Sequence, residues 1–212
     1  MASAIKMPRI VTEIVNATFT PDANIDETLS QAVAIISRQQ GLRSLKWGRW
    51  EEDPSRVQMM HIWEDISAHT DFMQSTDYPS LLSLFDGNLT GAPAIIHVYF
   101  DGDDTKINKI LADPLVEFAT FFGPKDDFED AVKNTLIVGT ASEGCLDYVR
   151  GEVVEEIAAT EDGVKGKAQY LAISWTSLED RVAATKRPDV QESGLRVVQS
   201  VEGYEVHHVK FK

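Results

Sequence analysis

Two stretches of the sequence end in the same way: APAIIHVYFDG at residues 92–102 and YEVHHVKFK at residues 204–212. Both contain the skeleton His-Val-x-Phe, at His97–Phe100 and at His208–Phe211. Residues two positions apart on a β-strand point to the same face. Each valine–phenylalanine pair is therefore predicted to lie on a core face, and each histidine on the opposite face. A strand ending that occurs twice predicts a repeated structural unit.

The first half of the chain predicts the element order β-α-β-β-α-β. Strands are expected where apolar and polar residues alternate, and helices where apolar residues recur three and four positions apart. The expected elements are a strand at 9–19, a helix at 24–41, strands at 42–50 and 56–63, a helix at 67–85 that Pro79 breaks in two, and a strand at 92–100. This order is the split βαβ, or ferredoxin-like, unit.

The second half predicts the same order again. Its expected elements are a strand at 114–122, a helix at 126–141, strands at 145–156 and 167–175, a helix at 177–193 interrupted by Pro188, and a strand at 203–211. Gly-x6-Gly occurs at Gly41–Gly48 and at Gly144–Gly151, and the third strand of each half ends in tryptophan. Two strands that are similar by coincidence would explain the shared ending but not this ordered series, so we predict a tandem repeat.

A single unit of this kind has helices on only one face of its sheet, so its other, apolar face needs a partner. The predicted fold class is therefore α+β: two ferredoxin-like β-α-β-β-α-β units in tandem. Their antiparallel sheets would pack face to face as a barrel-like sandwich with the helices outside. We expect an N-terminal unit at residues 1–102, a linker at 103–113 that is compatible with a short helix, and a more divergent C-terminal unit at 114–212.

Composition narrows the function classes. The net charge is -14 and the sequence pI is about 4.7. Such a surface repels phosphate backbones and anionic lipids, so neither nucleic acid nor a membrane is an expected partner. The single cysteine, Cys145, excludes an internal disulfide. Without a signal-peptide pattern or an apolar run of ~18 residues, we expect a cytoplasmic protein and a monomer that contains its own pseudo-dimer, with further oligomerisation left open.

The stretch IWEDISAHTDFMQSTDYPSLL at residues 62–82 follows the third strand. This stretch and the element order resemble the dimeric α+β barrel superfamily, most closely its antibiotic biosynthesis monooxygenase (ABM)-like branch. The matching positions are Trp63 with Glu64, His69 and Phe72 on the helix, and the group Ser75, Asp77 and Tyr78. The resemblance covers residues 9–100 well and residues 114–212 weakly, and it implies an intramolecular dimeric α+β barrel.

Members of this superfamily differ in activity, so the fold alone does not define the reaction. Some oxidise polyketide quinol precursors without metal or flavin, some degrade heme, some cyclise or isomerise polyketide-like substrates, and some are stress-response proteins. Leu82 stands where heme-degrading members carry the histidine ligand, and leucine cannot ligate iron. Tyr78 and Val57 stand at about the positions of the two histidines of cyclase-type members. Asn16, Trp63 and Tyr78 are compatible with the cofactor-free oxygenases.

The catalytic candidates are His61, Asn16 and Tyr78. Histidine titrates near pH ~6.5, so His61 is a candidate general base that would take a proton from a phenol or enol. The carbanion-like species would then react with oxygen or with an internal carbonyl. Tyr78 would donate a hydrogen bond to a substrate carbonyl, and Asn16 would be a polar contact on a pocket wall. Each also has a structural interpretation, as a packing residue or, for Asn16, as a backbone-bonded residue near a strand end.

The substrate-binding candidates are Trp63, Phe72, Met59 and His97. His69 is expected to be a solvated or packing residue, and His208 a structural one. Strand alternation places four residues on one face of the third strand: Val57, Met59, His61 and Trp63. By the superfamily pattern this face is expected to look into the sheet–sheet interior. The first-strand face that carries Asn16 is expected to form a pocket wall.

The second half offers less pocket chemistry, because Ala172 stands near the position of His61 and the nearest polar groups on its first strand are Glu117 and Thr120. We expect one chemically equipped cavity in the N-terminal half, with the C-terminal half mainly providing the partner sheet. No metal site is expected, since the adjacent His207 and His208 point to opposite faces and no His, Asp or Glu cluster has metal-ligand spacing.

The sequence thus predicts a pocket protein for a small hydrophobic or aromatic metabolite. The favoured activity is a cofactor-independent monooxygenase of the ABM type that acts on an aromatic or polyketide-like metabolite. Two alternatives stay open. One is a cyclase or isomerase that uses His61 or Tyr78 for proton transfer, and the other is a non-catalytic ligand-binding or stress-response barrel.

Overall fold

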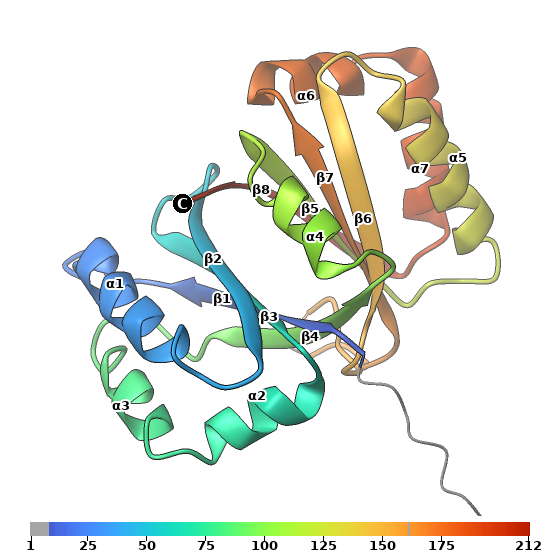
Figure 1. The fold of residues 1–212 in the computed structure, drawn as a ribbon. Coiled ribbons are helices and arrows are strands. Elements are labelled where there is room, and N and C mark those ends of the chain that lie inside the picture. The colour runs from blue at the N-terminus through green and yellow to red at the C-terminus, as the bar shows by residue number, and fades with distance from the viewer. Residues whose placement is uncertain (1–8, 161) are drawn as a thin grey trace, which may run out of the picture.

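The computed structural model describes residues 9–160 and 162–212, so the first eight residues of the predicted N-terminal unit lie outside the described residues. The elements follow the predicted order twice (Figure 1). The first half contains β1 (Val11–Thr18), α1 (Ile25–Ile36), β2 (Leu42–Trp50), β3 (Arg56–Trp63), α2 (Ile66–Met73), α3 (Tyr78–Ser83) and β4 (Ala94–Phe100). After α4 (Asp104–Ile110), the second half contains β5 (Leu115–Phe122), α5 (Phe128–Thr140), β6 (Cys145–Val153), β7 (Ala168–Trp175), α6 (Leu178–Thr185), α7 (Pro188–Gln199) and β8 (Gly203–Phe211).

The eight strands form one closed antiparallel barrel in the order β1-β3-β2-β8-β5-β7-β6-β4, with β4 paired back to β1. The two four-stranded sheets therefore join edge to edge, at a β2–β8 seam and a β4–β6 seam. Figure 1 shows α1, α2 and α3 outside the N-terminal sheet, and α5, α6 and α7 outside the C-terminal sheet. The predicted fold class is confirmed, and the pairing at both seams leaves no free edge among the strands that the structure describes.

The repeated glycine pattern belongs to these seams. The second glycines, Gly48 of β2 and Gly151 of β6, face the backbone of the neighbouring strand of the other half. A Cβ atom at Gly48 would overlap a backbone carbonyl of β8, and one at Gly151 would lie 2.6 Å from a backbone carbonyl oxygen of β4. The first glycines, Gly41 and Gly144, both have φ near 80°, a conformation that favours glycine. The pattern thus serves backbone geometry at equivalent places.

The repeated histidine also belongs to the seams. Across the β4–β6 seam, His97 donates its backbone N–H to Glu155 Oε2 at 2.8 Å, and its ring Nδ1 lies 2.6 Å from Glu155 Oε1. Across the β2–β8 seam, His208 makes the same pair of contacts with Glu52, at 3.1 Å and 2.5 Å. Each His–Glu pair ties one half of the chain to the other, so the shared histidine has a structural role in both halves.

The barrel interior is filled by side chains from alternate strand positions. Members of this core include Ile14 of β1, Met60 and Ile62 of β3, Phe118 of β5 and Tyr170 of β7. The expectation that Val57, Met59, His61 and Trp63 face the sheet–sheet interior is therefore wrong, because the alternate residues of β3 occupy it. The face with His61 packs toward the helices. A one-residue change in orientation moves every side chain of a strand to the other face.

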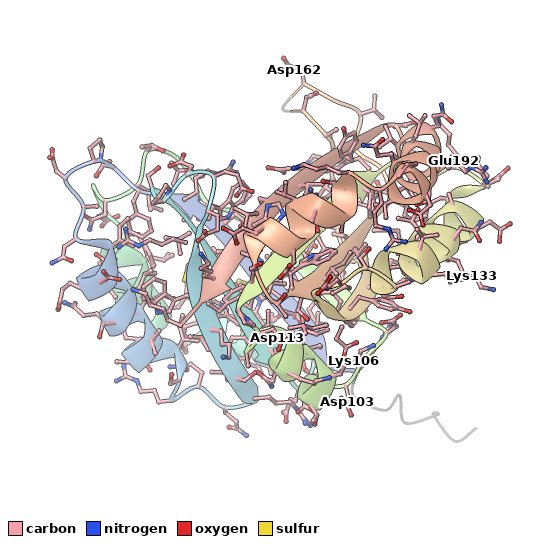
Figure 2. The ribbon with its side chains drawn as sticks, turned by 90° about the horizontal axis from the view of Figure 1, so that it is seen from above. Asp103, Lys106, Asp113, Lys133, Asp162 and Glu192 are labelled. Atoms are coloured by element: carbon pink, nitrogen blue, oxygen red, sulfur yellow. The ribbon has the colours of Figure 1, made fainter. Side chains whose placement is uncertain are left out.

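The predicted linker contains helix α4, which packs Ile107 and Ile110 into the barrel core. Figure 2 labels Asp103 and Lys106 at its start and Asp113 just beyond its end. Asp103 caps the helix by accepting a hydrogen bond from the backbone N–H of Lys106 at 2.8 Å. None of the helices in the described ranges is long and apolar enough to cross a membrane.

Candidate functional site

A cavity of about 110 Å³ lies between the N-terminal sheet and its helices. Its walls are mostly apolar and include Val15, Ala17, Met59, Phe72, Leu81 and Phe85. Four polar side chains also line it: Glu13, His61, His69 and Tyr78. Leu82 and Ile95 belong to the same walls and are 50% and 42% exposed, so the cavity opens to solvent beside them. An apolar pocket with a few convergent polar groups is typical of a small-molecule site.

A buried carboxylate, Glu13 of β1, organises the polar end of this cavity. It is 5% exposed. Its Oε2 accepts a hydrogen bond from Trp63 Nε1 at 3.0 Å and lies 2.9 Å from His61 Nδ1, and its Oε1 lies 3.3 Å from His69 Nε2. Burial alone would raise the pKa of Glu13, but His61, His69 and the Trp63 hydrogen bond together lower it to about 2. Glu13 is therefore a carboxylate at neutral pH.

The contact with Glu13 fixes the chemistry of His61. A carboxylate can only accept a hydrogen bond, so Nδ1 of His61 donates to Glu13, and in the neutral imidazole Nε2 carries the lone pair. Nε2 is buried and has no hydrogen-bond partner among residues 9–160 and 162–212. Because the ring lines the cavity, His61 offers a basic nitrogen to any ligand held there. Cross-strand pairing of Glu13 with His61 in the β1–β3 ladder sets this geometry.

The polar contacts continue from Glu13 to the protein surface. His69 Nδ1 lies 2.8 Å from His97 Nε2, and the other ring nitrogen of His97 contacts Glu155 at the seam. Burial lowers the pKa of His69, so its imidazole is neutral at pH 7, and its other ring nitrogen, Nε2, faces the Glu13 carboxylate. The side chain of Glu155 is 36% exposed. Four side chains thus connect the cavity to solvent, and the last of them, Glu155, comes from the C-terminal half.

Tyr78 stands at the start of α3, on the helix side of the cavity. The preceding residue, Asp77, accepts hydrogen bonds from Arg38 at 3.0 and 3.1 Å and from Gln39 at 2.8 Å, which ties the start of α3 to the end of α1. The Tyr78 ring packs edge-on against Phe72 at 5.4 Å. Burial, and then the charge of Glu13, raise the pKa of Tyr78. The phenol therefore stays protonated at neutral pH and can donate a hydrogen bond.

The structure gathers most of the predicted site residues at this one place. His61, Tyr78, Met59 and Phe72 line the cavity. Trp63 lies beneath it, bonded to Glu13 and stacked on His69 at 5.4 Å and on Phe72 at 5.9 Å, and His97 lies one contact further from the cavity. Asn16 does not join this group, because it shares its strand face with Ile14 of the barrel core. Its expected place on the wall of the same pocket as His61 is wrong.

Two members of the site were missed or misjudged from the sequence. Glu13 was not a candidate, although a single charge within the β-branched run VTEIV is a signal of a buried, partnered carboxylate. His69 was expected to be a solvated or packing residue, but it is 4% exposed, hydrogen-bonded to His97 and 3.3 Å from the Glu13 carboxylate.

The C-terminal half repeats part of this arrangement. Glu117 of β5 pairs across the sheet with Ile173, as Glu13 pairs with His61, so Ile173 and not Ala172 occupies the histidine position. Trp175 Nε1 donates to Glu117 Oε2 at 3.0 Å, and Arg181 donates to both Glu117 oxygens at 2.8 and 3.1 Å. The acid and the tryptophan are kept, whereas the basic imidazole is absent from this position. Among the described residues, no group of three or more His, Cys, Asp or Glu side chains could hold a metal ion.

The closed barrel and the acid–histidine site under the helices define the class of protein: a dimeric α+β barrel formed within one chain. Residues 15–80 match the family model described as antibiotic biosynthesis monooxygenase. This match spans His61, His69, Phe72 and Tyr78. The N-terminal half is thus similar to this family over residues 15–80, and the fold repeats the same unit in tandem.

Solved structures share this fold over nearly the whole chain. An anthrone oxidase-like protein superposes with a TM-score of 0.70 at 13% identity, over 97% of this chain and 92% of that one. A protein of Fusobacterium nucleatum subsp. nucleatum ATCC 25586, provisionally named a monooxygenase, gives 0.63 at 10% identity over 97% and 94%. A similarly named protein of Lactobacillus acidophilus NCFM gives 0.59 at 13% identity over 96% and 94%. No curated protein sequence matches the chain.

Proposed function

We propose that this protein is a cofactor-independent monooxygenase that acts on an aromatic or polyketide-like metabolite in the N-terminal cavity. One observation carries the proposal: Nδ1 of His61 is held by a buried carboxylate while Nε2 is unpartnered, among the described residues, in an apolar cavity. The family match over residues 15–80 supports it. The lone cysteine and the acidic surface fit the expected cytoplasmic location.

The cavity limits the substrate class. Its walls are apolar and its only charged group, Glu13, is negative and already engaged, so we expect an uncharged substrate with a weakly acidic C–H or O–H bond. The volume of about 110 Å³ is below the ~300 Å³ at which ordinary ligand pockets begin. We therefore expect one aromatic ring to enter, while the remainder of the molecule lies at the mouth beside Leu82 and Ile95.

Proton removal would begin the reaction. His61 Nε2 takes a proton from the substrate, and the Glu13 carboxylate stabilises the imidazolium that forms. Tyr78, a protonated phenol, donates a hydrogen bond to the oxygen on which negative charge develops. The resulting carbanion is electron-rich enough to react with molecular oxygen without a separate reductant.

The remaining steps balance without a cofactor. The carbanion forms a C–O bond to O₂, and the peroxide anion takes back the proton from His61. His61 then removes a second proton from the same carbon, the O–O bond breaks, and the departing hydroxide leaves as water with that proton. A methylene group becomes a carbonyl, and the substrate supplies all four electrons.

Oxygen uptake with anthrone tests the proposal. Anthrone has an activated methylene group, and the name of one structural neighbour contains this compound. We expect His61→Gln to lower the rate by about 10²–10⁴, the usual contribution of a general base. His208→Gln is the matched control, since His208 is a buried histidine bonded to glutamate in the other half, and it should keep the wild-type rate. An unchanged rate in His61→Gln would remove His61 from the mechanism.

The same acid–base pair favours a second candidate, a cyclase or isomerase, because His61 and Tyr78 could enolise a substrate that then attacks its own carbonyl. Product formation without oxygen distinguishes this activity from oxygenation. Binding without turnover in either assay would indicate the non-catalytic barrel.

A further inference from the structure

We propose that the C-terminal half holds a second ligand-binding site, for an uncharged, largely apolar molecule of one or two rings that is bound without proton transfer. Two adjoining cavities of about 300 and 240 Å³ lie between the C-terminal sheet and its helices. They share Glu117, Thr135, Leu136, Ile173, Arg181 and Gly194. The sequence predicted that the C-terminal half mainly provides the partner sheet. These cavities give it a binding role as well. This inference does not depend on the proposed oxygenase activity.

Two glycines on helices keep this space open. Gly139 of α5 and Gly194 of α7 line the cavities. A Cβ atom added at either glycine would meet no heavy atom of the described residues within 4 Å. Glycine is a poor helix former, and alanine would fit at both places. Figure 2 shows Lys133 of α5 and Glu192 of α7 at the outer side of these helices, away from the sheet. At Gly139 and Gly194 the two helices thus place no side chain in the space.

Among the described residues that line these cavities, one buried side-chain polar atom has no partner. The Thr135 hydroxyl is buried, and within the described part of the chain it has no hydrogen-bond partner. Thr135 lines both cavities. A buried hydroxyl without a partner is unfavourable, and a ligand oxygen or N–H group would satisfy it. We therefore expect the ligand to carry one hydrogen-bonding group.

The charged groups of this site are already neutralised. Arg181 forms a two-point ion pair with Glu117, and Trp175 donates to the same carboxylate. Burial raises the pKa of Cys145, which also lines the larger cavity, to about 11, so its thiol is neutral. A charged ligand would find no free countercharge here. Arg181 cannot accept a proton, the Glu117 carboxylate is occupied by Arg181 and Trp175, and Ile173 stands where a basic imidazole would be. Among the described residues, the site can therefore bind but has no free general base.

Anaerobic calorimetric titration with 1-naphthol tests this site, because the probe is uncharged, apolar and carries one hydroxyl. Gly194→Leu fills the open space, whereas Gly91→Leu makes the same change at an exposed glycine, also with open space around it. We expect Gly194→Leu to lose one equivalent of bound 1-naphthol relative to wild type, and Gly91→Leu to lose none. The same number of equivalents and the same affinities in Gly194→Leu, or no binding by the wild type, would overturn the proposal.

A second variant keeps the test decisive if Gly194→Leu does not fold. Thr135→Val removes the unpartnered hydroxyl at nearly constant volume. It should weaken 1-naphthol at the C-terminal site by about tenfold, the value of one hydrogen bond of ~1.4 kcal/mol. It should leave the binding of naphthalene, which has no hydroxyl, unchanged. Equal effects on both probes, or none on either, would contradict the assigned polar contact.

Discussion

Replacing Glu13 with glutamine removes the charge at the centre of the N-terminal site while keeping the side-chain shape. Glutamine can still accept one hydrogen bond, but its amide N–H group would face an imidazole nitrogen of His61 or His69 that now donates to the carboxylate. We therefore expect a less stable protein, and a stability deficit that depends on pH in a calculable way.

The magnitude follows from the pKa of Glu13, which the structure lowers from an ordinary 4.5 to about 2. A gap of about 2.5 pH units corresponds to about 3 kcal/mol of folding free energy at neutral pH, at about 1.4 kcal/mol per unit. A lowered pKa stabilises the fold above the unfolded value, and this contribution is lost as pH falls toward the folded value. It should be about 3 kcal/mol at pH ~6 and about 1.4 kcal/mol at pH ~3.

Urea unfolding of the wild type and of Glu13→Gln, between pH ~3 and pH ~6, measures this difference. The control is Glu152→Gln, the same change at an exposed strand position, where we expect only a small difference in stability. If the stability difference between wild type and Glu13→Gln were the same at both ends of the range, the Glu13 carboxylate would not be held by the two imidazoles as described.

Three further predictions concern the seams and the barrel core. Glu155→Gln and Glu52→Gln remove equivalent seam contacts, so their urea midpoints should fall by similar amounts. Only Glu155→Gln should alter turnover and its pH profile, because only its seam histidine, His97, leads on to the proposed active site. Equal effects of the two substitutions on turnover would refute this link. Gly48→Ala places a methyl group against the backbone of β8 and should cost about 1–3 kcal/mol in urea unfolding, so an unchanged midpoint would argue against the tight seam. Burial lowers the pKa of His207, which is 2% exposed, to about 3. As pH falls below ~6.5, the unfolded chain therefore binds a proton at this histidine before the folded chain does, and the free energy of unfolding of the wild type should fall by up to about 1.4 kcal/mol per pH unit down to pH ~3. A His207→Leu variant with the same pH slope would contradict this.

The fold was predictable because its signals are local. Alternation and helical spacing gave the element order of each half, and the repeated glycines and histidines sit at backbone contacts that both halves need. The orientation of β3 was not predictable in the same way. Every residue from Val57 to Trp63 is buried, so both faces of this strand are covered by the protein. Alternation then says which residues share a face, but not which face looks into the barrel.

The site was predictable only in part, for a related reason. His61 was a candidate because imidazole chemistry depends on residue type alone. The role of Glu13 depends on partners from β3 and α2 that only the folded chain brings within hydrogen-bonding distance. The C-terminal cavities depend on side chains that are absent, notably at Gly194, and a missing side chain leaves no chemical signature in the sequence.

Proton removal by His61 in the absence of oxygen is the most direct test of the central claim. Anthrone mixed anaerobically with the protein should give the absorbance of its enolate when the wild type is present. With His61→Gln the enolate should be lost, whereas with His208→Gln it should form as in the wild type. Admission of oxygen should then consume the enolate only in the proteins that formed it. Equal enolate formation with His61→Gln would contradict the claim that this residue is the general base.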